Sequence, residues 1–282
     1  MFALSTSEPI DYLLIGHIAC DITPDGLRLG GTAAYSALTA HALGLRVGIV
    51  TAWGEEIKPE PLQGIPVVNF PAEHSTTFEN VYTSQGRVQT IRHIAPRLDY
   101  YMVPLPWRSA QLVHLGPIAQ EVAPSLVQHF PAALLGLTPQ GWLRQWDAQG
   151  HVSPGEWPEG SVILRQAGAA VISVEDVEGD DTRIEEMASS CPILAVTEAA
   201  NGVSLYWHGD VRRFRAPAMA EVDATGAGDI FAAAFFTRLY LTRDPWEAAR
   251  FATQLASFSV TRVGLASIPT TEEIEACQIE VL

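Results

Sequence analysis

Short apolar segments alternate with helix-like segments along most of this 282-residue chain, and this alternation limits the possible folds more than any other feature. Turn residues bound the apolar segments, which is typical of strands that are buried on both faces. These segments are residues 12–15, 47–51, 112–115, 133–137, 171–174 and 193–197. Helical patterns occupy residues 31–43, 122–130, 181–189, 228–239 and 245–261. The alternation predicts a mostly parallel sheet covered by helices on both faces.

Two further pairs of segments alternate apolar and polar residues instead. Residues 76–83 and 88–94 flank Gln85-Gly86, and residues 203–207 and 211–214 flank a turn of three residues. This pattern predicts β-hairpins with one solvated face. The first hairpin interrupts the strand–helix alternation, so we expect it to lie outside the main sheet.

Composition restricts the classes of function. An apolar content of 48% is sufficient for a core, and a net charge of −15 argues against nucleic acid or an anionic membrane as the main partner. An anionic nucleotide remains compatible, because local dipoles and a few arginines can hold it. Three scattered cysteines without a CxxC pair predict neither a zinc site nor disulfides, and favour a reducing, cytoplasmic location. We find no signal-peptide pattern and no apolar run of the roughly 18 residues that a membrane helix needs.

The segment D-A-T-G-A-G-D, residues 223–229, carries the clearest chemical signal. Its small residues let the backbone approach an anion, and the first turn of the following helix offers unpaired N–H groups. Together these predict a phosphate cradle. Asp229 adds a negative charge beside that anion, which is reasonable if it accepts a proton from a hydroxyl attacking a phosphoryl group. The structural alternative is an ordinary helix N-terminus with Asp223 or Thr225 as its cap.

This segment resembles the D-T-x-G-A-G-D signature of the ribokinase-like (PfkB) carbohydrate kinases, with Ala224 as the one substitution. Upstream, an acid after the first strand and a Gly-Gly pair that opens a helix resemble the N-terminal motif of the same family. The resemblance implies an α/β fold: a three-layer α/β/α sandwich with a mostly parallel central sheet, in a single domain of residues 1–282. It also implies a small β lid formed by residues 23–29 and 67–94.

The resemblance further implies an ATP-dependent kinase. Asp229 would be the catalytic base, and the backbone N–H groups of Gly226, Ala227 and Gly228 would form the anion hole. Magnesium would be organised by Asp176 or Glu175, because the family carries N-x-x-E where this chain has Ser173 to Asp176. Solvated acids after a strand are the alternative interpretation of that pair.

The resemblance also selects residues for the acceptor substrate. Asp21 would accept hydrogen bonds from hydroxyl groups, and the glycine pair would let the substrate lie against the helix start. The asparagine that the family places after this pair is missing here, unless Thr32 replaces it. The predicted substrate-binding residues are Asp21, Gly30, Gly31, Thr32, Asn80, Arg92, Arg144 and Asp229. For several of these a structural role is the alternative: an acid at a turn, a solvated hairpin face or a surface ion pair.

The nucleotide would lie along T-E-A-A-N-G, which resembles the family's T-x-G-x-x-G with Ala199 in place of a glycine. The predicted ATP-binding residues are Thr197, Glu198, Ala199, Gly202, Thr225, Gly226, Gly228, Thr253, Ala256, Ser257 and Gly264. Three of these lie on a helical stripe that is more often core than pocket.

The segment T-T-F-E-N-V-Y resembles inositol-kinase-like members, which ranks a cyclitol or a sugar above a nucleoside. The alternatives are a nucleoside or vitamin-precursor kinase on the same fold, and a non-catalytic homologue that senses a sugar or nucleotide. An NAD-dependent oxidoreductase is disfavoured, because no G-x-G-x-x-G follows the first strand. The exposed edge of the lid hairpin is a natural pairing surface for a second copy.

Overall fold

A computed structural model describes residues 8–83 and 86–278 of the chain. Its larger sheet, within these residues, has nine strands in the order β15-β14-β13-β12-β9-β8-β1-β4-β5. The pairs are parallel except for β13–β14 and β14–β15, which are antiparallel. The strands are β1 (Tyr12–Ile15), β4 (Val47–Trp53), β5 (Val67–Pro71), β8 (Leu112–Leu115), β9 (Leu134–Leu137), β12 (Ala169–Ser173), β13 (Ile193–Thr197), β14 (Val203–Trp207) and β15 (Asp210–Phe214).

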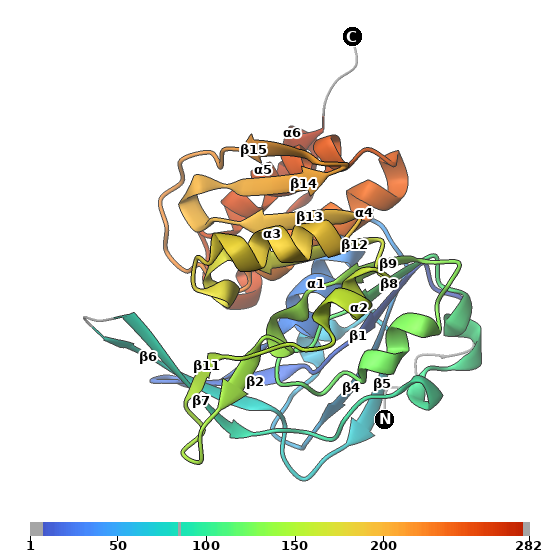
Figure 1. Ribbon diagram of the computed structural model, residues 1–282. Helices are drawn as coiled ribbons and strands as arrows, with labels where there is room; N and C mark the ends of the chain where they lie inside the picture. The colour runs from blue at the N-terminus through green and yellow to red at the C-terminus, as the bar shows by residue number, and fades with distance from the viewer. Residues whose placement is uncertain (1–7, 84–85, 279–282) are drawn as a thin grey trace.

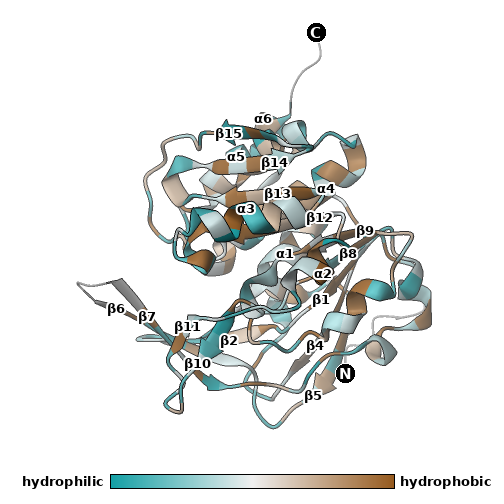
Figure 2. Cartoon of the chain, in the orientation of Figure 1, coloured by the Kyte–Doolittle hydropathy of each residue, from teal (hydrophilic) through white to brown (hydrophobic). Residues whose placement is uncertain are grey.

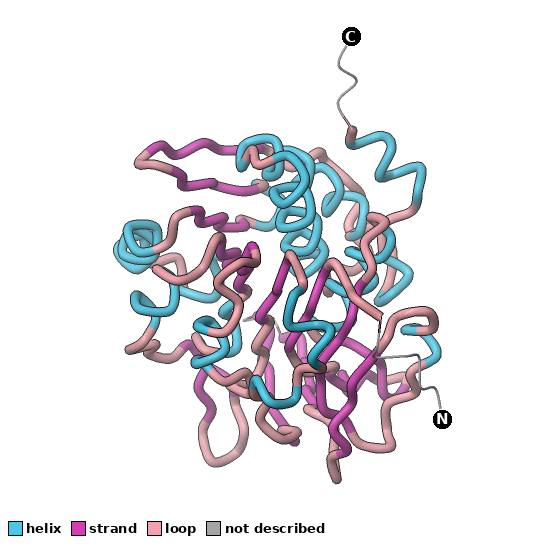
Figure 3. Tube along the Cα trace, turned by 90° about the vertical axis from the view of Figure 1, so that its right-hand side faces the viewer, coloured by secondary structure: helices cyan, strands magenta, loops and turns pink. Residues whose placement is uncertain are grey.

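Helices cover both faces of this sheet, which confirms the predicted α/β architecture (Figures 1 and 3). Because side chains alternate across a strand, Tyr12 and Leu14 of β1 pack with one layer of helices, whereas Leu13 and Ile15 pack with the other. The first layer holds α1 (Thr32–Ala42), α4 (Ala227–Thr242), α5 (Pro245–Ser259) and α6 (Thr271–Cys277). The second holds α2 (Gly160–Leu164) and α3 (Asp181–Ser190). Figure 2 shows apolar colours along the central strands and mixed colours on α3, whose apolar residues face the sheet.

A second sheet of four strands lies outside the larger one, in the order β3-β2-β6-β7 (Figure 1). It contains β2 (Ala19–Thr23), β3 (Gly26–Gly30), β6 (Thr77–Thr83) and β7 (Gly86–His93). The predicted hairpin therefore lies outside the main sheet, and Gln85 of its turn falls outside the described residues. The expectation that this sheet begins near residue 67 is wrong, because β5 pairs in parallel with β4 in the larger sheet.

Two local expectations differ from the structure. Residues 122–130 form only a short 3-10 helix, Pro124–Gln128, instead of an α-helix. Pro124 lacks an N–H and Pro131 disfavours helical backbone at the residue before it, so too few residues remain for a stable α-helix. A small hairpin of β10 (Arg144–Trp146) and β11 (Val152–Pro154) was not expected, since three-residue strands carry too little alternation to detect.

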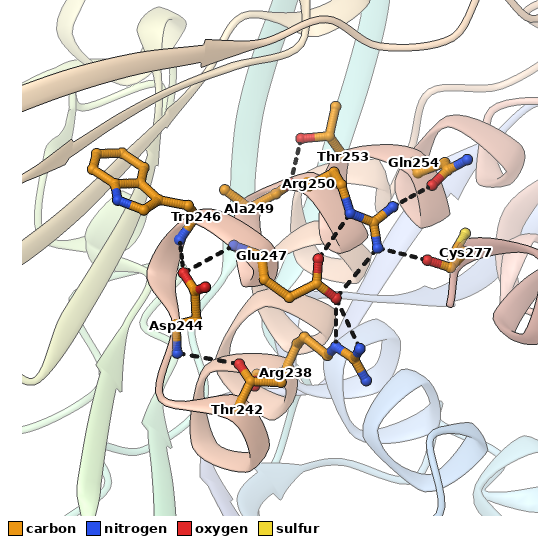
Figure 4. Close-up of polar contacts among 10 residues, drawn as sticks. All are labelled: Arg238, Thr242, Asp244, Trp246, Glu247, Ala249, Arg250, Thr253, Gln254 and Cys277. Carbon is orange, nitrogen blue, oxygen red and sulfur yellow. Dashed lines mark hydrogen bonds and ion pairs between the residues drawn. The ribbon is translucent and has the colours of Figure 1, made fainter. Parts of the chain in front are cut away.

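Helix α4 is fastened to its neighbours by a charged network (Figure 4). Glu247 of α5 accepts hydrogen bonds from Arg238 of α4 at 2.8 Å and from Arg250 at 2.8 Å. Arg250 also donates to the backbone carbonyl of Cys277, at 2.8 Å, in α6. These groups are partly buried, so the pairs are screened less than surface ion pairs. The network fixes α4, whose first turn carries the candidate base.

The described residues contain no helix with the length and apolarity that crossing a bilayer requires. The three cysteines, Cys20, Cys191 and Cys277, are buried and unpaired.

Candidate active site

The loop before α4 leaves the start of this helix open. Within the described residues, no side chain caps the helix. Asp223 instead accepts hydrogen bonds from the backbone N–H groups of Thr225, at 2.9 Å, and Gly264, at 3.1 Å. The helix therefore begins with N–H groups that no side chain satisfies, as an anion site requires. The alternative of a capped N-terminus is wrong.

Gly226 has a conformation and a neighbour that exclude other residues. Its φ of 80° lies in the left-handed region, which costs little only for glycine. A Cβ at this position would collide with the ring of Tyr35 from α1. The first turn of α1 therefore packs directly against the predicted anion hole of Gly226, Ala227 and Gly228.

Asp229 is the third residue of α4 and is partly buried. Helix α1 holds it at two points. The hydroxyl of Ser36 donates to the Asp229 backbone carbonyl at 3.1 Å, and the Thr32 hydroxyl forms a hydrogen bond with the Asp229 carboxyl group. Thr32 and Ser36 lie one turn apart on α1, so one helical face sets the position of this carboxylate. Thr32 was predicted to bind the substrate. In the structure its hydroxyl is hydrogen-bonded to the candidate base, and that prediction did not include this contact.

The charge environment of Asp229 suits a base. The pKa of Asp229 is raised to about 6, first by burial and then by the negative charges of Asp176 and Asp21. The Thr32 hydrogen bond and the Arg144 guanidinium act in the opposite direction and favour the charged form. A carboxylate of this kind is ionised at neutral pH and is more basic than an ordinary aspartate.

Asp21 lies on β2 at the start of a polar row that crosses the second sheet. Asn80 of β6 donates to the Asp21 carboxylate at 3.4 Å, and Gln89 of β7 donates to the Asn80 side-chain oxygen at 2.9 Å. A Cβ at Gly30 would collide with the Asp21 carboxyl group, so the glycine makes room for it. Gln89 was missed by the sequence reasoning, although it stands directly opposite Asn80 in the β6–β7 register. Gly31 follows as the N-cap of α1 with a φ of 85°.

Arg144 and Asp176 come from other elements and act on the same carboxylate, Asp229. Arg144 of β10 donates to the Ile118 carbonyl at 3.1 Å, and its charge acts on both Asp176 and Asp229. Asp176 accepts hydrogen bonds from the Ser173 backbone at 2.8 Å and from the Gln140 side chain at 3.2 Å. Burial raises the pKa of Asp176. The structure therefore collects Asp21, Asp176, Asp229, Thr32 and Arg144 into one electrostatic cluster.

The donor set fits magnesium only in part. Among the described residues, no three histidine, cysteine, aspartate or glutamate side chains converge as a complete ligand set. Magnesium bound to phosphates keeps several waters and needs only one or two carboxylates, so Asp176 is compatible with an outer role. Glu175 is exposed, and its negative charge raises the pKa of Asp176.

Arg92 is the substrate-side prediction that the structure does not bring into this cluster. It is exposed and pairs with Glu79 across the β6–β7 hairpin. Arg28, which was not predicted, does reach the site: from β3 it approaches Asp223 of the loop before α4, at 3.8 Å.

The predicted nucleotide residues form two groups. Thr197 is the last residue of β13 and Glu198 follows it, in a segment where Ala199 has a φ of 49° and Gly202 a φ of 100°. On α5 the hydroxyls of Thr253 and Ser257 donate to backbone carbonyls of their own helix, at 2.7 and 2.6 Å. Ala256 is partly buried on the same helix, and Gly264 lies against Arg28. Their roles toward ATP stay predictions.

The chain is similar in sequence to known kinases. Residues 167–272 match the family described as pfkB family carbohydrate kinase. The chain is 26% identical over 212 residues to an inositol 3-kinase of Zea mays, which covers 73% of this chain and 54% of the maize protein. The chain thus spans about half the length of that relative. It is 29% identical over 250 residues to a cytidine kinase of Thermococcus kodakarensis, covering 80% and 87%. A fructokinase of Escherichia coli is 26% identical over 302 residues, covering 93% and 97%.

Comparison with solved structures gives the same fold. A pyrophosphate-dependent kinase in the ribokinase family, complexed with a pyrophosphate analogue and myo-inositol, has a TM-score of 0.80 at 21% identity and covers 94% of this chain and 99% of its own. Arabidopsis thaliana ribokinase, complexed with ribose and ATP, has a TM-score of 0.72 at 17% identity, covering 96% and 99%. These likenesses establish the ribokinase fold.

Proposed function

We propose that this chain, which carries a domain of the PfkB carbohydrate kinase family on a ribokinase fold, transfers a phosphoryl group to a hydroxyl of a small polyhydroxylated ring. The observation that carries the proposal is the Asp229 carboxylate, held by Thr32 at the open N-terminus of α4. A base beside an anion site is the arrangement that phosphoryl transfer needs.

Each group has a separate task. Asp229 accepts the proton of the attacking hydroxyl as the new oxygen–phosphorus bond forms. The backbone N–H groups of Gly226, Ala227 and Gly228 stabilise the negative charge on the transferred group. The bond to the leaving phosphate breaks, and the donor diphosphate or phosphate departs with its electron pair. Magnesium, when bound to the donor phosphates, neutralises their charge, and Asp176 would hold its water shell.

The donor is proposed to be ATP, and pyrophosphate is the second candidate. Ala199 stands where the resembling nucleotide segment has a glycine, and it adopts a left-handed φ of 49°. The methyl group of Ala199 takes up space that a glycine would leave to the nucleotide, and this favours a smaller donor. One structural relative, with a TM-score of 0.80, is named as pyrophosphate-dependent.

The acceptor is proposed to be a cyclitol or a sugar. The row of Asp21, Asn80 and Gln89 presents carboxylate and amide groups, which match the alternating donors and acceptors of a neutral polyol. Relatives named inositol 3-kinase and fructokinase favour this class, whereas the cytidine kinase keeps a nucleoside as an alternative. A non-catalytic sensor is disfavoured by Asp229, since sensing needs no base.

The test is a matrix of donors and acceptors. ATP and pyrophosphate would each be combined with myo-inositol, ribose, fructose, fructose 6-phosphate and adenosine, with the phosphorylated product followed by ³¹P NMR. We expect the highest kcat/KM for myo-inositol or a free sugar. A tenfold preference for adenosine or fructose 6-phosphate would overturn the acceptor class. Absence of any product with either donor would overturn the kinase itself.

A homodimer through the second sheet is proposed as well. Leu27, Val81 and Val88 are exposed to 56%, 49% and 44% on strands β3, β6 and β7. Light scattering tests this: a monomer at micromolar concentration contradicts it, and replacement of Val81 and Val88 by threonine is expected to weaken a dimer.

A further inference from the structure

Three neighbouring strands share a buried chain of hydrogen bonds that the proposed mechanism does not use. The Tyr12 hydroxyl of β1 lies 2.8 Å from Nδ1 of His114 on β8, and Nε2 of His114 lies 2.9 Å from the hydroxyl of Thr138. Tyr12 and His114 are fully buried, and Thr138, which directly follows β9, is 7% exposed. A polar chain in an apolar core is costly unless each group is satisfied, so its proton arrangement is strongly constrained.

Burial fixes the direction of these hydrogen bonds. Burial lowers the pKa of His114 to about 3, so its ring is neutral and carries a single N–H. If that proton were on Nδ1, the Tyr12 hydroxyl would accept it and its own O–H would have no acceptor among the described residues. Either tautomer leaves one O–H without an acceptor in the described part of the chain, that of Tyr12 or that of Thr138, and such a group costs about 1–3 kcal/mol where neither water nor a ligand can reach it. Tyr12 is fully buried, whereas Thr138 retains 7% exposure at the carboxyl edge of the sheet, so the unpaired O–H costs less at Thr138. Tyr12 therefore donates to Nδ1, and Nε2–H of His114 donates to Thr138.

This direction leaves the O–H of Thr138 free to donate, because its oxygen already accepts from His114. No acceptor for it is present among the residues that the structure describes. Thr138 is more than nine-tenths buried and lies at the carboxyl end of β9, where ligands of open α/β sheets bind.

Thr138 also lies near Thr32, the hydrogen-bond partner of the candidate base. The space where Gly116 lacks a Cβ is bounded by the Thr32 methyl group and by the Thr138 hydroxyl oxygen. Thr32 is hydrogen-bonded to Asp229, and Gln140, two residues after Thr138, is bonded to Asp176. Besides burial, the Asp229 charge raises the pKa of Tyr12, so the chain and the base share one electrostatic environment.

We propose that the Thr138 hydroxyl donates a hydrogen bond to an oxygen of the acceptor substrate, and that Tyr12 and His114 are positioning residues that fix the direction of this bond. The inference rests on the proposed kinase function, because it names a further contact to the same acceptor. It assigns to Thr138 a substrate-binding role, and it requires an acceptor with a hydroxyl or ring oxygen near the reacting group.

The experiment compares Thr138→Val, Thr138→Ser, Tyr12→Phe and the double variant Tyr12→Phe/Thr138→Val. Thr39→Val is the matched control, since it removes a hydroxyl that is equally buried and has no partner in α1. Thermal melting establishes that each variant is folded. The readouts are KM for the preferred acceptor of the matrix above, KM for the donor, and kcat. The tautomer of His114 is read separately from ¹⁵N NMR shifts of the wild-type ring.

We expect Thr138→Val to raise the acceptor KM about tenfold with the donor KM unchanged, and Thr138→Ser to restore it. Tyr12→Phe should raise the acceptor KM by a smaller factor and add nothing to Thr138→Val, because both act through one hydroxyl. Thr39→Val should leave all constants unchanged. The expected tautomer carries the proton on Nε2.

An unchanged acceptor KM in folded Thr138→Val would overturn the proposal. So would independent, multiplying effects of Tyr12→Phe and Thr138→Val, or a proton on Nδ1 of His114. If the wild-type protein phosphorylates no acceptor, the proposed function has failed. In that case binding of myo-inositol, measured by calorimetry on wild type and Thr138→Val, decides the inference: equal affinities, or no binding to either, overturn it.

Discussion

The two sides of the candidate site are built in different ways. The anion side is one stretch of chain, the loop of residues 223–226 and the first turn of α4. The acceptor side is assembled from separate elements: Asp21 on β2, Asn80 on β6, Gln89 on β7 and Arg144 on β10. A local site depends on backbone conformation, whereas an assembled site depends on strand register. The anion side should therefore control the chemical step, and the acceptor side should control which substrate binds.

Asp229→Asn tests the anion side and should have the largest effect. Loss of a general base costs about 10²–10⁴ in rate, so kcat should fall by that factor while ATP binding, measured by calorimetry, stays nearly intact. Asp181→Asn, which alters an exposed first-turn acid of α3, is the control and should be silent. Retention of more than half of the wild-type turnover would rule out Asp229 as the base.

Asp21→Ala tests the acceptor side. Removing a charged acceptor that bonds substrate hydroxyls should raise the acceptor KM about 10²-fold and leave the donor KM little changed. Asp25→Ala, in the exposed turn of the same hairpin, should change neither constant. Equal effects of Asp21→Ala on both ligands would indicate a structural role and would remove the distinction between the two sides.

Thr32→Val tests the contact that joins the two sides. The pKa of Asp229, raised to about 6 by burial, predicts that kcat declines as the pH falls through about 6, because the base becomes protonated. Loss of the Thr32 hydrogen bond to the charged carboxylate should move this acidic limb to higher pH and lower kcat several-fold, whereas Thr32→Ser should preserve both. The groups facing Asp229 are Arg144, Asp176 and Asp21, together with the phenols of Tyr12 and Tyr35. An unchanged pH profile in Thr32→Val would contradict the assignment.

Ala199→Gly should have the smallest effect. A left-handed backbone costs a non-glycine residue about 1–2 kcal/mol, and glycine removes this cost. Glycine also increases the conformational entropy of the unfolded chain, which lowers the stability of the folded protein by about 0.4–1 kcal/mol. We therefore expect a stabilisation below about 1 kcal/mol, measured by urea unfolding. Ala200→Gly, at a neighbouring residue without positive φ, should destabilise instead. A destabilised Ala199→Gly would mean that the alanine methyl group has a packing role.

The same difference explains which groups of the candidate site the sequence could indicate. Asp229 and the glycines before it were predicted because their chemistry lies in consecutive residues. Gln89 and Arg28 were missed because each becomes relevant only through a partner, Asn80 or Asp223, that the fold brings from elsewhere. Arg92 was selected as a lid cation, but its cross-strand neighbourhood supplies Glu79 as a nearer partner.

The overall architecture was predictable for a related reason. Buried parallel strands leave short apolar runs that can be read locally, and β1, β8 and β13 have the expected bounds. The segment 122–130 failed, because its apolar spacing resembles a helix while Pro124 and Pro131 limit it to one short turn. The periodicity of apolar residues shows which face of a segment is apolar. It does not show whether the backbone can form the number of hydrogen bonds that an α-helix needs.

The hydrogen bond from Arg250 to the backbone carbonyl of Cys277 has a consequence for biosynthesis. Chains emerge from the ribosome at about 5–20 residues per second and begin to fold from the N-terminus. Strands β1 to β10, with Asp21, its amide neighbours and Arg144, leave the exit tunnel long before α6 is translated. The acceptor side can therefore form on the nascent chain, whereas the helix that bears the candidate base is held in place by α5 and α6 only when nearly all of the described chain has been made.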